Sequence, residues 1–204
     1  MRIAIINFNT GNLYSIKKSI IELGHEAFIC NNSEDLISSD KIILPGVGSY
    51  FNAFNYLLKS GFVDSLNELV IKKGVPILGI CLGMQLFCNS STEKKFSKGL
   101  SFVDAEVVSL RDIDCKLKVP HIGWNNITIK KKNAIFHDIS DNSDFYFVHD
   151  FVVRAKDQEI VLATTTHDVD FVSMFQKNNI YGVQFHPEKS SNSGSQLIKN
   201  FLEL

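Results

Sequence analysis

The first 90 residues alternate between short apolar runs and segments with helical spacing. Leu13, Ile16, Ile20 and Leu23 recur every three or four positions, which predicts a helix over residues 12–23. The run at 75–80 is almost entirely apolar, as expected for a strand buried on both faces of a parallel sheet. The same pattern predicts strands at 2–7, 26–30 and 41–44 and helices at 51–58, 62–73 and 82–89. This alternation is typical of an open α/β sheet.

The second half of the chain is richer in strands. Short apolar runs predict strands at residues 103–110, 127–130, 145–148, 151–154, 160–166, 171–175 and 180–184. Few helical segments lie between them, so we expect part of this half to form antiparallel sheet, followed by a last helix at 194–202. The expected fold class is therefore α/β, with an open mixed, mostly parallel sheet flanked by helices and additional antiparallel strands in the second half.

Length and charge limit the classes of function. The 204 residues, 45% of them hydrophobic, suit one well-packed domain over residues 1–204. The formal net charge of -1 gives no bulk attraction to nucleic acid. No apolar run approaches the roughly 20 residues of a membrane span. We therefore expect a cytoplasmic protein that binds neither nucleic acid nor membrane.

The cysteines follow no metal or disulfide pattern. Cys30, Cys81, Cys88 and Cys115 form no CxxC pair and no metal-binding spacing with histidine. In a cytoplasmic chain such thiols are expected to be free. No metal or other cofactor is implied.

Cys81 differs from the other cysteines in its surroundings. The pattern Gly79-x-Cys81-x-Gly83 lies between the predicted strand at 75–80 and the predicted helix at 82–89. It is a nucleophile elbow with sulfur in place of a serine hydroxyl, and its sharp turn leaves no room for a Cβ on either side. The free N–H groups at the start of the next helix favour a thiolate. Cys81 is therefore the candidate nucleophile, whereas Cys88 is interpreted as a packing residue in the middle of that helix.

His186 is the strongest candidate for the base that a thiol nucleophile needs. It follows the predicted strand at 180–184, and open α/β sheets place their sites at this carboxyl edge. Pro187 favours an extended path, in which His186 and Glu188 point the same way. We predict that Glu188 holds one ring nitrogen of His186 while the other faces Cys81, which is the arrangement of a catalytic triad.

Attack of a thiolate on an amide carbon creates an oxyanion, which needs N–H donors. In an elbow the residue after the nucleophile, here Leu82, supplies one donor. The second is expected from the glycine-rich loop LPGVG at 44–48, where Val47 or Gly48 is the candidate. Such a loop is weak support alone, and its value comes from its agreement with the elbow.

Together these segments resemble the class I (triad) glutamine amidotransferases, and within that class the family of glutaminase subunits of imidazole glycerol phosphate synthase. The matching segments span the chain: Gly11-Asn12-Leu13, LPGVG at 44–48, GICLGMQL at 79–86, VPHIGWN at 119–125, YFVH at 146–149 and GVQFHPEKS at 182–190. The GICLGMQ and FHPEKS segments are specific to the class, and PHIGWN narrows the resemblance to this subunit family.

The resemblance implies a catalytic site for L-glutamine. The triad would be Cys81, His186 and Glu188, and it would release glutamate and ammonia through a thioester without a cofactor. The resemblance implies that glutamine is bound by Gly48, Gln85, Glu93 and the strand His149, Asp150 and Phe151. Glu93 suits the substrate ammonium group, and Gln85 suits its polar end.

The resemblance also implies a protein partner. The partner would be a (β/α)8-barrel cyclase subunit that forms a heterodimer with this chain and receives ammonia through a channel, in histidine biosynthesis. The positions that match the interface are Asn12, Trp124, Asn125, Tyr146 and Lys189. Trp124 is the sole tryptophan and lies in a polar loop, which favours an interface over a core position.

The chain departs from the usual family pattern at two places. It has His149-Asp150-Phe151 where the family usually shows His-Ser/Thr-Tyr, and Asn7-Phe8-Asn9 where the family usually shows Asp-Tyr-Gly. Neither departure touches the triad, but both leave the pathway open. One alternative is a paralogous glutaminase that supplies another synthase, for example one acting on surface-sugar precursors. Another is a non-catalytic subunit that binds and regulates its partner. An esterase-like hydrolase with cysteine in place of serine would leave Gln85 and the His-Pro-Glu order unexplained.

Overall fold

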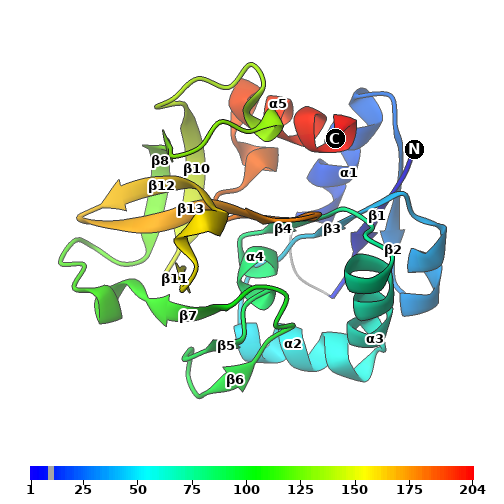
Figure 1. Cartoon of the computed structure of the whole chain (residues 1–204), viewed down its shortest axis with the longest axis horizontal. Coiled ribbons are helices and arrows are strands. Elements are labelled where there is room, and N and C mark those ends of the chain that lie inside the picture. The colour runs from blue at the N-terminus through cyan, green and yellow to red at the C-terminus, as the bar shows by residue number, and fades with distance from the viewer. Residues whose placement is uncertain (9–11) are drawn as a thin grey trace.

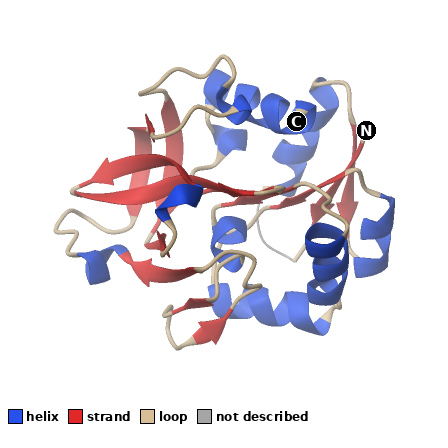
Figure 2. Cartoon of the chain, in the orientation of Figure 1, coloured by secondary structure: helices blue, strands red, loops and turns tan. Residues whose placement is uncertain are grey.

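The structure is a computed structural model that describes residues 1–8 and 12–204. Residues 9–11 lie outside the described residues, and with them Asn9 and Gly11 of the family matches discussed above. The described residues form one large mixed sheet with helices on both faces, and a separate two-stranded sheet at one end (Figure 1 and Figure 2). This arrangement confirms the predicted α/β class with a mixed sheet flanked by helices.

The parallel part of the large sheet has the strand order β2-β1-β3-β4-β14. Its strands are β1 (Arg2–Ile6), β2 (Glu26–Cys30), β3 (Lys41–Leu44), β4 (Ile77–Ile80) and β14 (Ile180–Val183). Every residue of β4 and β14 is buried, because layers cover both faces of the sheet there. β14 comes from the end of the chain yet pairs in parallel with β4, with Val183 opposite Ile80. The residues that follow these two strands therefore lie side by side.

Beyond β14 the large sheet continues mainly through antiparallel pairs, as expected for the second half of the chain. β13 pairs with β14, β12 and β11, and β11 pairs with β7. The strands of this part are β5 (Ser90–Ser91), β6 (Ser97–Lys98), β7 (Ala105–Ser109), β9 (Thr128–Ile129), β11 (Phe151–Ala155), β12 (Val161–His167) and β13 (Val169–Lys177).

The two-stranded sheet pairs β8 (His121–Asn126) with β10 (Asp144–His149), and Trp124 lies opposite Tyr146. No strand is predicted from the sequence at β8. Its more buried positions are His121, Gly123 and Asn125, so the alternation of apolar and polar residues that identifies a half-buried strand is missing. The strand predicted at 127–130 is reduced to two residues, β9, which pair with β12, while the Ile127 N–H donates instead to the Ser143 carbonyl.

Helices cover the two faces of the large sheet (Figure 1). On one face lie α1 (Leu13–Glu22) and α5 (Ser191–Glu203), and on the other α2 (Tyr50–Lys59), α3 (Phe62–Leu66) and α4 (Leu82–Leu86). Ile3 and Ile5 of β1 belong to the core beneath α1 and α5, whereas Ala4 and Ile6 belong to the opposite core. This division follows from the alternation of side chains along a strand. No helix in the described ranges is both long and apolar enough to cross a membrane.

Two predicted helices end differently in the structure. The segment 62–73 begins as α3 and continues as a π-helix, η2 (Asn67–Lys72), with a hydrogen bond from the Lys73 N–H to the Glu68 carbonyl. The helix predicted at 82–89 ends at Leu86, because the Asn89 N–H donates to the Ala105 carbonyl of β7 instead. Cys88 therefore follows the helix rather than lying in its middle, and it is fully buried.

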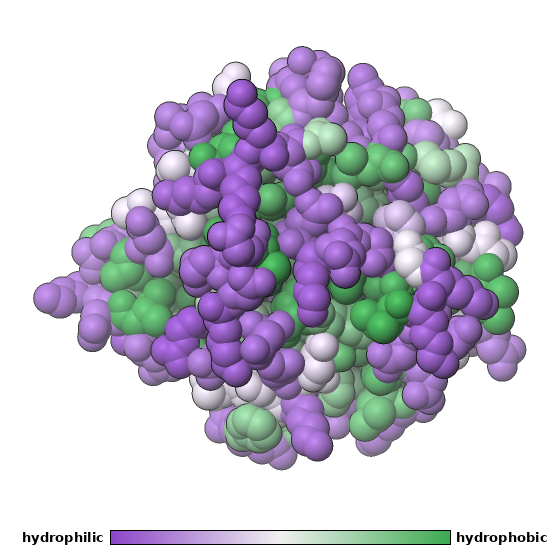
Figure 3. All heavy atoms as spheres, viewed as in Figure 1, coloured by the Kyte–Doolittle hydropathy of each residue, from purple (hydrophilic) through white to green (hydrophobic). Residues whose placement is uncertain are grey.

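Short 3₁₀ turns complete the described secondary structure. They are η1 (Ser33–Ser38), η3 (Leu110–Ile113), η4 (Ala134–Phe136), η5 (Gln158–Ile160) and η6 (Pro187–Lys189). On the face shown in Figure 3, hydrophilic residues are interspersed with smaller apolar patches. The last of these turns, η6, follows β14 and contributes to the site described below.

The turn from β4 to α4 has the close packing that the elbow pattern predicts. A Cβ on Gly79 would lie 2.7 Å from backbone atoms of Gly83 and Met84, and a Cβ on Gly83 would collide with the Leu44 carbonyl. Cys81 has φ 53° and ψ -107°, a conformation that side-chain-bearing residues rarely adopt. Its N–H donates to the Val183 carbonyl at 2.8 Å, so the pairing with the β14 strand helps to hold this conformation.

We predict that Gly83→Ala destabilises the fold by about 3 kcal/mol or more, because the new methyl group meets backbone that cannot move aside. Urea unfolding measures the change. Gly24→Ala is the control: it also has a positive φ, 83°, but nothing lies within 4 Å of its Cβ. Its expected cost is about 1 kcal/mol. Equal losses in the two variants would contradict the close packing of the elbow.

Candidate active site

The segments after β4 and β14 bring the three predicted triad residues together. Cys81 follows β4, His186 follows β14 and Glu188 lies in η6. His186 Nδ1 lies 2.9 Å from Glu188 Oε1, and both side chains are only 2% exposed. His186 Nε2 is buried and has no hydrogen-bond partner within ordinary bonding distance among the described residues. One ring nitrogen is thus fixed by a carboxylate, and the other is left for a reacting group.

The backbone between His186 and Glu188 differs from the expected extended path. Pro187 begins the 3₁₀ turn η6, because its fixed φ and missing N–H suit the first helical position. The expectation of an extended segment through Pro187 is therefore wrong. The turn nevertheless brings the Glu188 carboxylate back to the imidazole of His186.

The charge state of His186 is set by its neighbours. Burial by itself lowers the pKa of the imidazole, but the Cys81 thiol and the Glu188 carboxylate outweigh burial and raise this pKa to about 10. A hydrogen-bond acceptor and a carboxylate beside the ring favour its protonated form. The site therefore favours an imidazolium on His186, with Cys81 on one side and Glu188 on the other.

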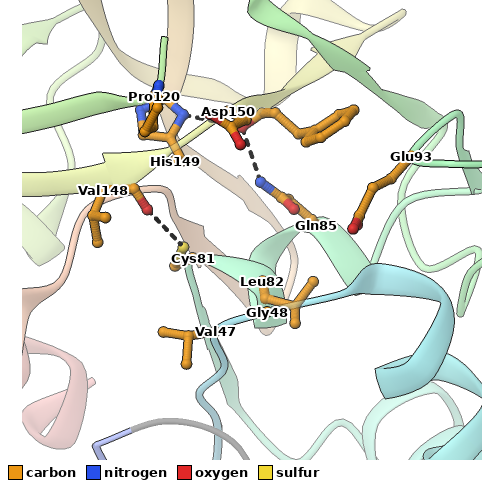
Figure 4. A pocket seen from close by; sticks show the side chains of 11 residues that line it. Val47, Gly48, Cys81, Leu82, Gln85, Glu93, Pro120, Val148, His149 and Asp150 are labelled. Atoms are coloured by element: carbon orange, nitrogen blue, oxygen red, sulfur yellow. Dashed lines mark hydrogen bonds between the residues drawn. The ribbon is translucent and has the colours of Figure 1, made fainter.

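A pocket of about 390 Å³ opens beside Cys81 (Figure 4). The Cys81 sulfur points toward the Val148 carbonyl, 3.9 Å away, and Glu93 lies across the pocket from it. The lining residues are Val47, Gly48, Cys81, Leu82, Gln85, Glu93, Pro120, Val148, His149, Asp150 and Phe151. Every residue predicted to bind glutamine or its oxyanion therefore lines one pocket, with the nucleophile candidate in its wall.

The predicted oxyanion donors lie at this pocket, but one of them is engaged. The Leu82 N–H donates to the Gly46 carbonyl, with 3.4 Å between nitrogen and oxygen. Gly48 has φ 99°, which suits glycine, and Val47 is 39% exposed. An oxyanion that uses the Leu82 N–H would have to replace the Gly46 carbonyl.

Glu93 and Gln85 are both held by hydrogen bonds at the pocket. Glu93 Oε2 accepts from the Tyr50 N–H at 2.7 Å, at the start of α2. Gln85 Nε2 donates to the Phe151 carbonyl at 3.0 Å and to Gln184 Oε1 at 3.1 Å. Both amide hydrogens of Gln85 are therefore used inside the protein, and its oxygen is the atom left to meet a substrate.

The segment His149-Asp150-Phe151 is not one strand as expected: β10 ends at His149, the chain bends at Asp150 and β11 begins at Phe151. Asp150 is exposed, whereas His149 is buried and its Nδ1 lies 3.0 Å from the Phe151 carbonyl. His149 Nε2 lies 3.0 Å from His121 Nδ1. Burial lowers the pKa of His149 to about 3 and that of His121 to about 4, and the neighbouring histidines add to both shifts. Both rings are therefore neutral near pH 7.

Gln184 and His121 are buried polar residues at the site that sequence reasoning missed. Gln184 is fully buried, and its Nε2 donates to Cys81 Sγ at 3.6 Å. A signal for Gln184 exists in the sequence, because it is a polar residue inside the apolar run before His186. No such signal marks His121, which lies on the unpredicted strand β8.

Three of the five predicted interface residues form one cluster. The rings of Trp124 and Tyr146 are 6.1 Å apart at their centroids, and Lys189 Nζ lies 5.7 Å from the Tyr146 ring centroid. Trp124 is 54% exposed. Asn125 points to the other side of β8, where its amide donates to the Thr166 carbonyl. Asn12 precedes α1 and accepts a hydrogen bond from Ser15.

Comparison with known proteins identifies the class. A family model described as "Glutamine amidotransferase class-I" matches residues 4–204. Two solved structures share the fold: a glutamine amidotransferase, with TM-score 0.76, 18% identity and coverage of 98% of this chain and 97% of that chain, and PurLQS from Thermotoga maritima, with TM-score 0.75, 16% identity and coverage of 99% and 97%. The chain belongs to the class I glutamine amidotransferases.

Within that class, three relatives that match over nearly their whole length are each named as the same subunit. Imidazole glycerol phosphate synthase subunit HisH 1 of Campylobacter jejuni is 45% identical over 202 residues, which cover 99% of this chain and 100% of that protein. Subunit HisH 2 of Methanococcus maripaludis is 44% identical and covers 98% of each chain. Subunit HisH of Buchnera aphidicola is 44% identical over the full length of both chains.

The two neutral histidines predict a pH dependence of stability. The pKa values of His121 and His149 fall below the usual 6.5 on folding, so the unfolded chain binds more protons than the folded one in acid. Their contribution is complete above about pH 6.5 and is lost as the pH falls toward the folded values. As the pH falls from about 6.5 to about 4.5, the free energy of unfolding decreases by at most about 1.4 kcal/mol per pH unit for each of these two histidines.

Urea unfolding of His121→Asn across this range measures the effect, and its slope with pH should be shallower than that of the wild type. His137→Asn is the control, because the His137 side chain is 74% exposed. Identical slopes in all three proteins would show that the buried histidines are not held neutral.

Proposed function

We propose that this chain is the glutaminase subunit of imidazole glycerol phosphate synthase. In this role it hydrolyses L-glutamine to glutamate and ammonia and passes the ammonia to the cyclase subunit in histidine biosynthesis. The observation that carries the proposal is the Cys81 thiol in a pocket wall beside the buried His186–Glu188 pair. The HisH relatives, 44–45% identical along their whole length, support the pathway. We further propose that residues 1–204 act as one glutamine amidotransferase domain, since the family model spans 4–204.

In the proposed first half-reaction, Cys81, His186 and Glu188 act as nucleophile, base and orienter. His186 takes the Cys81 proton, and the sulfur bonds to the amide carbon of glutamine while the carbonyl electron pair moves to oxygen. The oxyanion then collapses and the C–N bond breaks. The leaving nitrogen takes the proton from His186 and departs as ammonia. Glu188 stabilises the imidazolium throughout, which the raised pKa of His186 favours.

In the second half-reaction, a water molecule attacks the thioester carbon and gives its proton to His186. The C–S bond breaks as the second oxyanion collapses, glutamate leaves and the sulfur recovers the proton. The N–H of Leu82 and that of Val47 or Gly48 are the proposed donors to both oxyanions. Neither half-reaction changes an oxidation state, and neither requires a cofactor.

The pocket fits the two ends of glutamine. The Glu93 carboxylate, across the pocket from Cys81, is proposed to bind the substrate ammonium group. The free oxygen of Gln85 and the backbone of the segment 149–151, between β10 and β11, are proposed to bind its polar atoms. Because Asp150 is exposed and takes part through its backbone in this proposal, the departure from the usual family triplet leaves the chemistry unchanged.

The proposed partner is a (β/α)8-barrel cyclase, which forms a heterodimer with this chain. Asn12, Trp124, Asn125, Tyr146 and Lys189 are the proposed contacts, and the exposed Trp124–Tyr146–Lys189 cluster supports them. A cytoplasmic location is proposed because Cys30, Cys81, Cys88 and Cys115 are all free thiols, as is usual in a reducing compartment.

We predict that Cys81→Ala abolishes glutamate release from glutamine, because no other thiol lines the pocket among the described residues. The same variant should still support the partner's synthase reaction when free ammonia is supplied. Cys30→Ala is the control and should retain glutaminase activity, since Cys30 lies on β2, its thiol donates to the Asn32 carbonyl and it does not belong to the pocket lining given above. Loss of the ammonia-dependent reaction in Cys81→Ala would show that Cys81 has a structural role instead.

Glutamate release with and without a histidine-pathway cyclase and its nucleotide substrate tests the pathway. We expect strong stimulation when the cyclase and nucleotide are present together. Slow turnover that the cyclase cannot stimulate would contradict the histidine pathway and favour a paralogous glutaminase for another synthase. No turnover with any partner would favour a regulatory binding subunit.

A further inference from the structure

A chain of buried hydrogen bonds runs away from Cys81 toward strand β8. Gln184 Nε2 donates to Cys81 Sγ at 3.6 Å, and Gln184 Oε1 accepts from Gln85 Nε2 at 3.1 Å. Gln85 Nε2 also donates to the Phe151 carbonyl at 3.0 Å. That carbonyl lies 3.0 Å from His149 Nδ1, and so it has a second donor. Four hydrogen bonds, through Gln184, Gln85 and the Phe151 carbonyl, therefore connect the Cys81 sulfur to the ring of His149.

The chain continues from His149 to Asn125 on β8. His149 Nε2 lies 3.0 Å from His121 Nδ1, and His121 Nε2 lies 3.2 Å from the Asn125 amide nitrogen. His121, His149 and Gln184 are at most 6% exposed, so water does not compete for these bonds. Asn125 is half-buried and adjoins the exposed Trp124, which is one of the proposed partner contacts.

Carbonyl oxygens fix the direction of every bond in this chain. The Phe151 carbonyl can only accept, so His149 Nδ1 carries a hydrogen and the neutral His149 ring accepts at Nε2. His121 Nδ1 must then donate to it, and the neutral His121 accepts at Nε2. The same carbonyl fixes Gln85 Nε2 as a donor, which places the oxygen of Gln184 toward Gln85 and its amide hydrogens toward Cys81.

The outer end fixes the same direction independently. Asn125 accepts from the Asn126 N–H through its oxygen at 2.9 Å and donates to the Thr166 carbonyl at 3.0 Å. Its nitrogen therefore faces His121 as a donor, as the inner end requires. The lowered pKa values of His121 and His149 agree with these directions, which require both rings to be neutral. Protonation of either ring would place two N–H donors opposite each other.

We propose that Gln184 is a positioning residue for the Cys81 sulfur and that Asn125, His121, His149 and Gln85 hold its amide in place through one continuous chain of hydrogen bonds, in which the Phe151 carbonyl accepts from both sides. The chain connects the nucleophile to a strand of the partner face. Its significance for regulation rests on the proposed function, because that function places a cyclase against β8. The role of Gln184 itself requires no partner. A donor aimed at the sulfur favours the thiolate over the thiol.

The inner end is tested by the alkylation of Cys81 with iodoacetamide, followed by mass spectrometry of the Cys81 peptide across pH 5 to 9. Gln184→Met keeps the size of the side chain and removes its donors. We expect alkylation at neutral pH to slow about tenfold and the pH profile to move up by about one unit, as for the loss of one hydrogen bond to a charged acceptor. An unchanged profile in a folded Gln184→Met protein would overturn the proposal.

The outer end is tested with Asn125→Leu, a change at a half-buried position that the fold should tolerate even if Gln184→Met unfolds. We expect alkylation of Cys81 to slow about threefold, because His121 loses the donor that orders the chain. Asn126→Leu is the matched control. The Asn126 side chain is exposed on the other side of β8 from that of Asn125, and we expect no change in the alkylation rate. Equal rates in Asn125→Leu and Asn126→Leu would overturn the outer part of the chain.

A double-mutant cycle tests whether the two ends belong to one chain. In the Gln184→Met background, Asn125→Leu should cause no further slowing of alkylation, since the link to the sulfur is already broken. Independent, additive effects would contradict a continuous chain. These measurements use neither glutamine nor a partner, so they test the chain of hydrogen bonds from Asn125 to Cys81 even if the proposed function is wrong. Failure of the proposed function would be seen separately, as absence of stimulation of the wild type by a cyclase.

Discussion

The parallel pairing of β4 with β14 is the contact on which the candidate site depends. The two strands are about a hundred residues apart in the sequence, yet Val183 lies opposite Ile80, and the Val183 carbonyl accepts the Cys81 N–H. This register places Cys81 and His186 at the same carboxyl edge of the sheet. A slip of one residue would turn every side chain of β14 to the opposite face, and the buried His186–Glu188 pair would lose its place beside the thiol.

The strained turn at Cys81 is stable because rigid elements surround it. Its positive φ is compensated by close packing of Gly79 and Gly83 against backbone, which leaves no room for relaxation. Around this fixed sulfur, the pocket is formed by segments that are remote in the sequence. They include the loop after β3, the turn between β5 and β6 that contains Glu93, and the start of β11. The scaffold fixes the nucleophile, and loops supply the groups that recognise substrate.

The site residues that could be predicted from the sequence are those that a short local sequence pattern identifies. Cys81 is framed by glycines at a strand–helix junction, and His186 and Glu188 are close in the chain, so both could be placed without knowing the strand order. Even there, the 3₁₀ turn at Pro187 differs from the expected extended path. The helix after Cys81 also ends earlier than its apolar spacing predicts, because the sheet takes up the Asn89 N–H.

What the sequence conceals are the polar contacts between remote segments. β8 has polar residues at its more buried positions, so no hydrophobic alternation marks it as a strand. His121 therefore gave no sign that it would meet His149, and Gln184 gave only a weak one. Nor could the sequence show that the Leu82 N–H is engaged by the Gly46 carbonyl, which depends on the conformation of a glycine-rich loop. Such contacts follow from tertiary structure rather than from any local preference.

The central claim is that the Cys81 sulfur forms a covalent bond to the side-chain amide carbon of glutamine, from which ammonia leaves. Rapid acid quenching of the protein during turnover of glutamine, followed by digestion and mass spectrometry, tests it directly. The account predicts a glutamyl group on the peptide that contains Cys81, removed by hydroxylamine as a thioester is. A glutamyl group on Cys30, Cys88 or Cys115, with Cys81 remaining free, would contradict it.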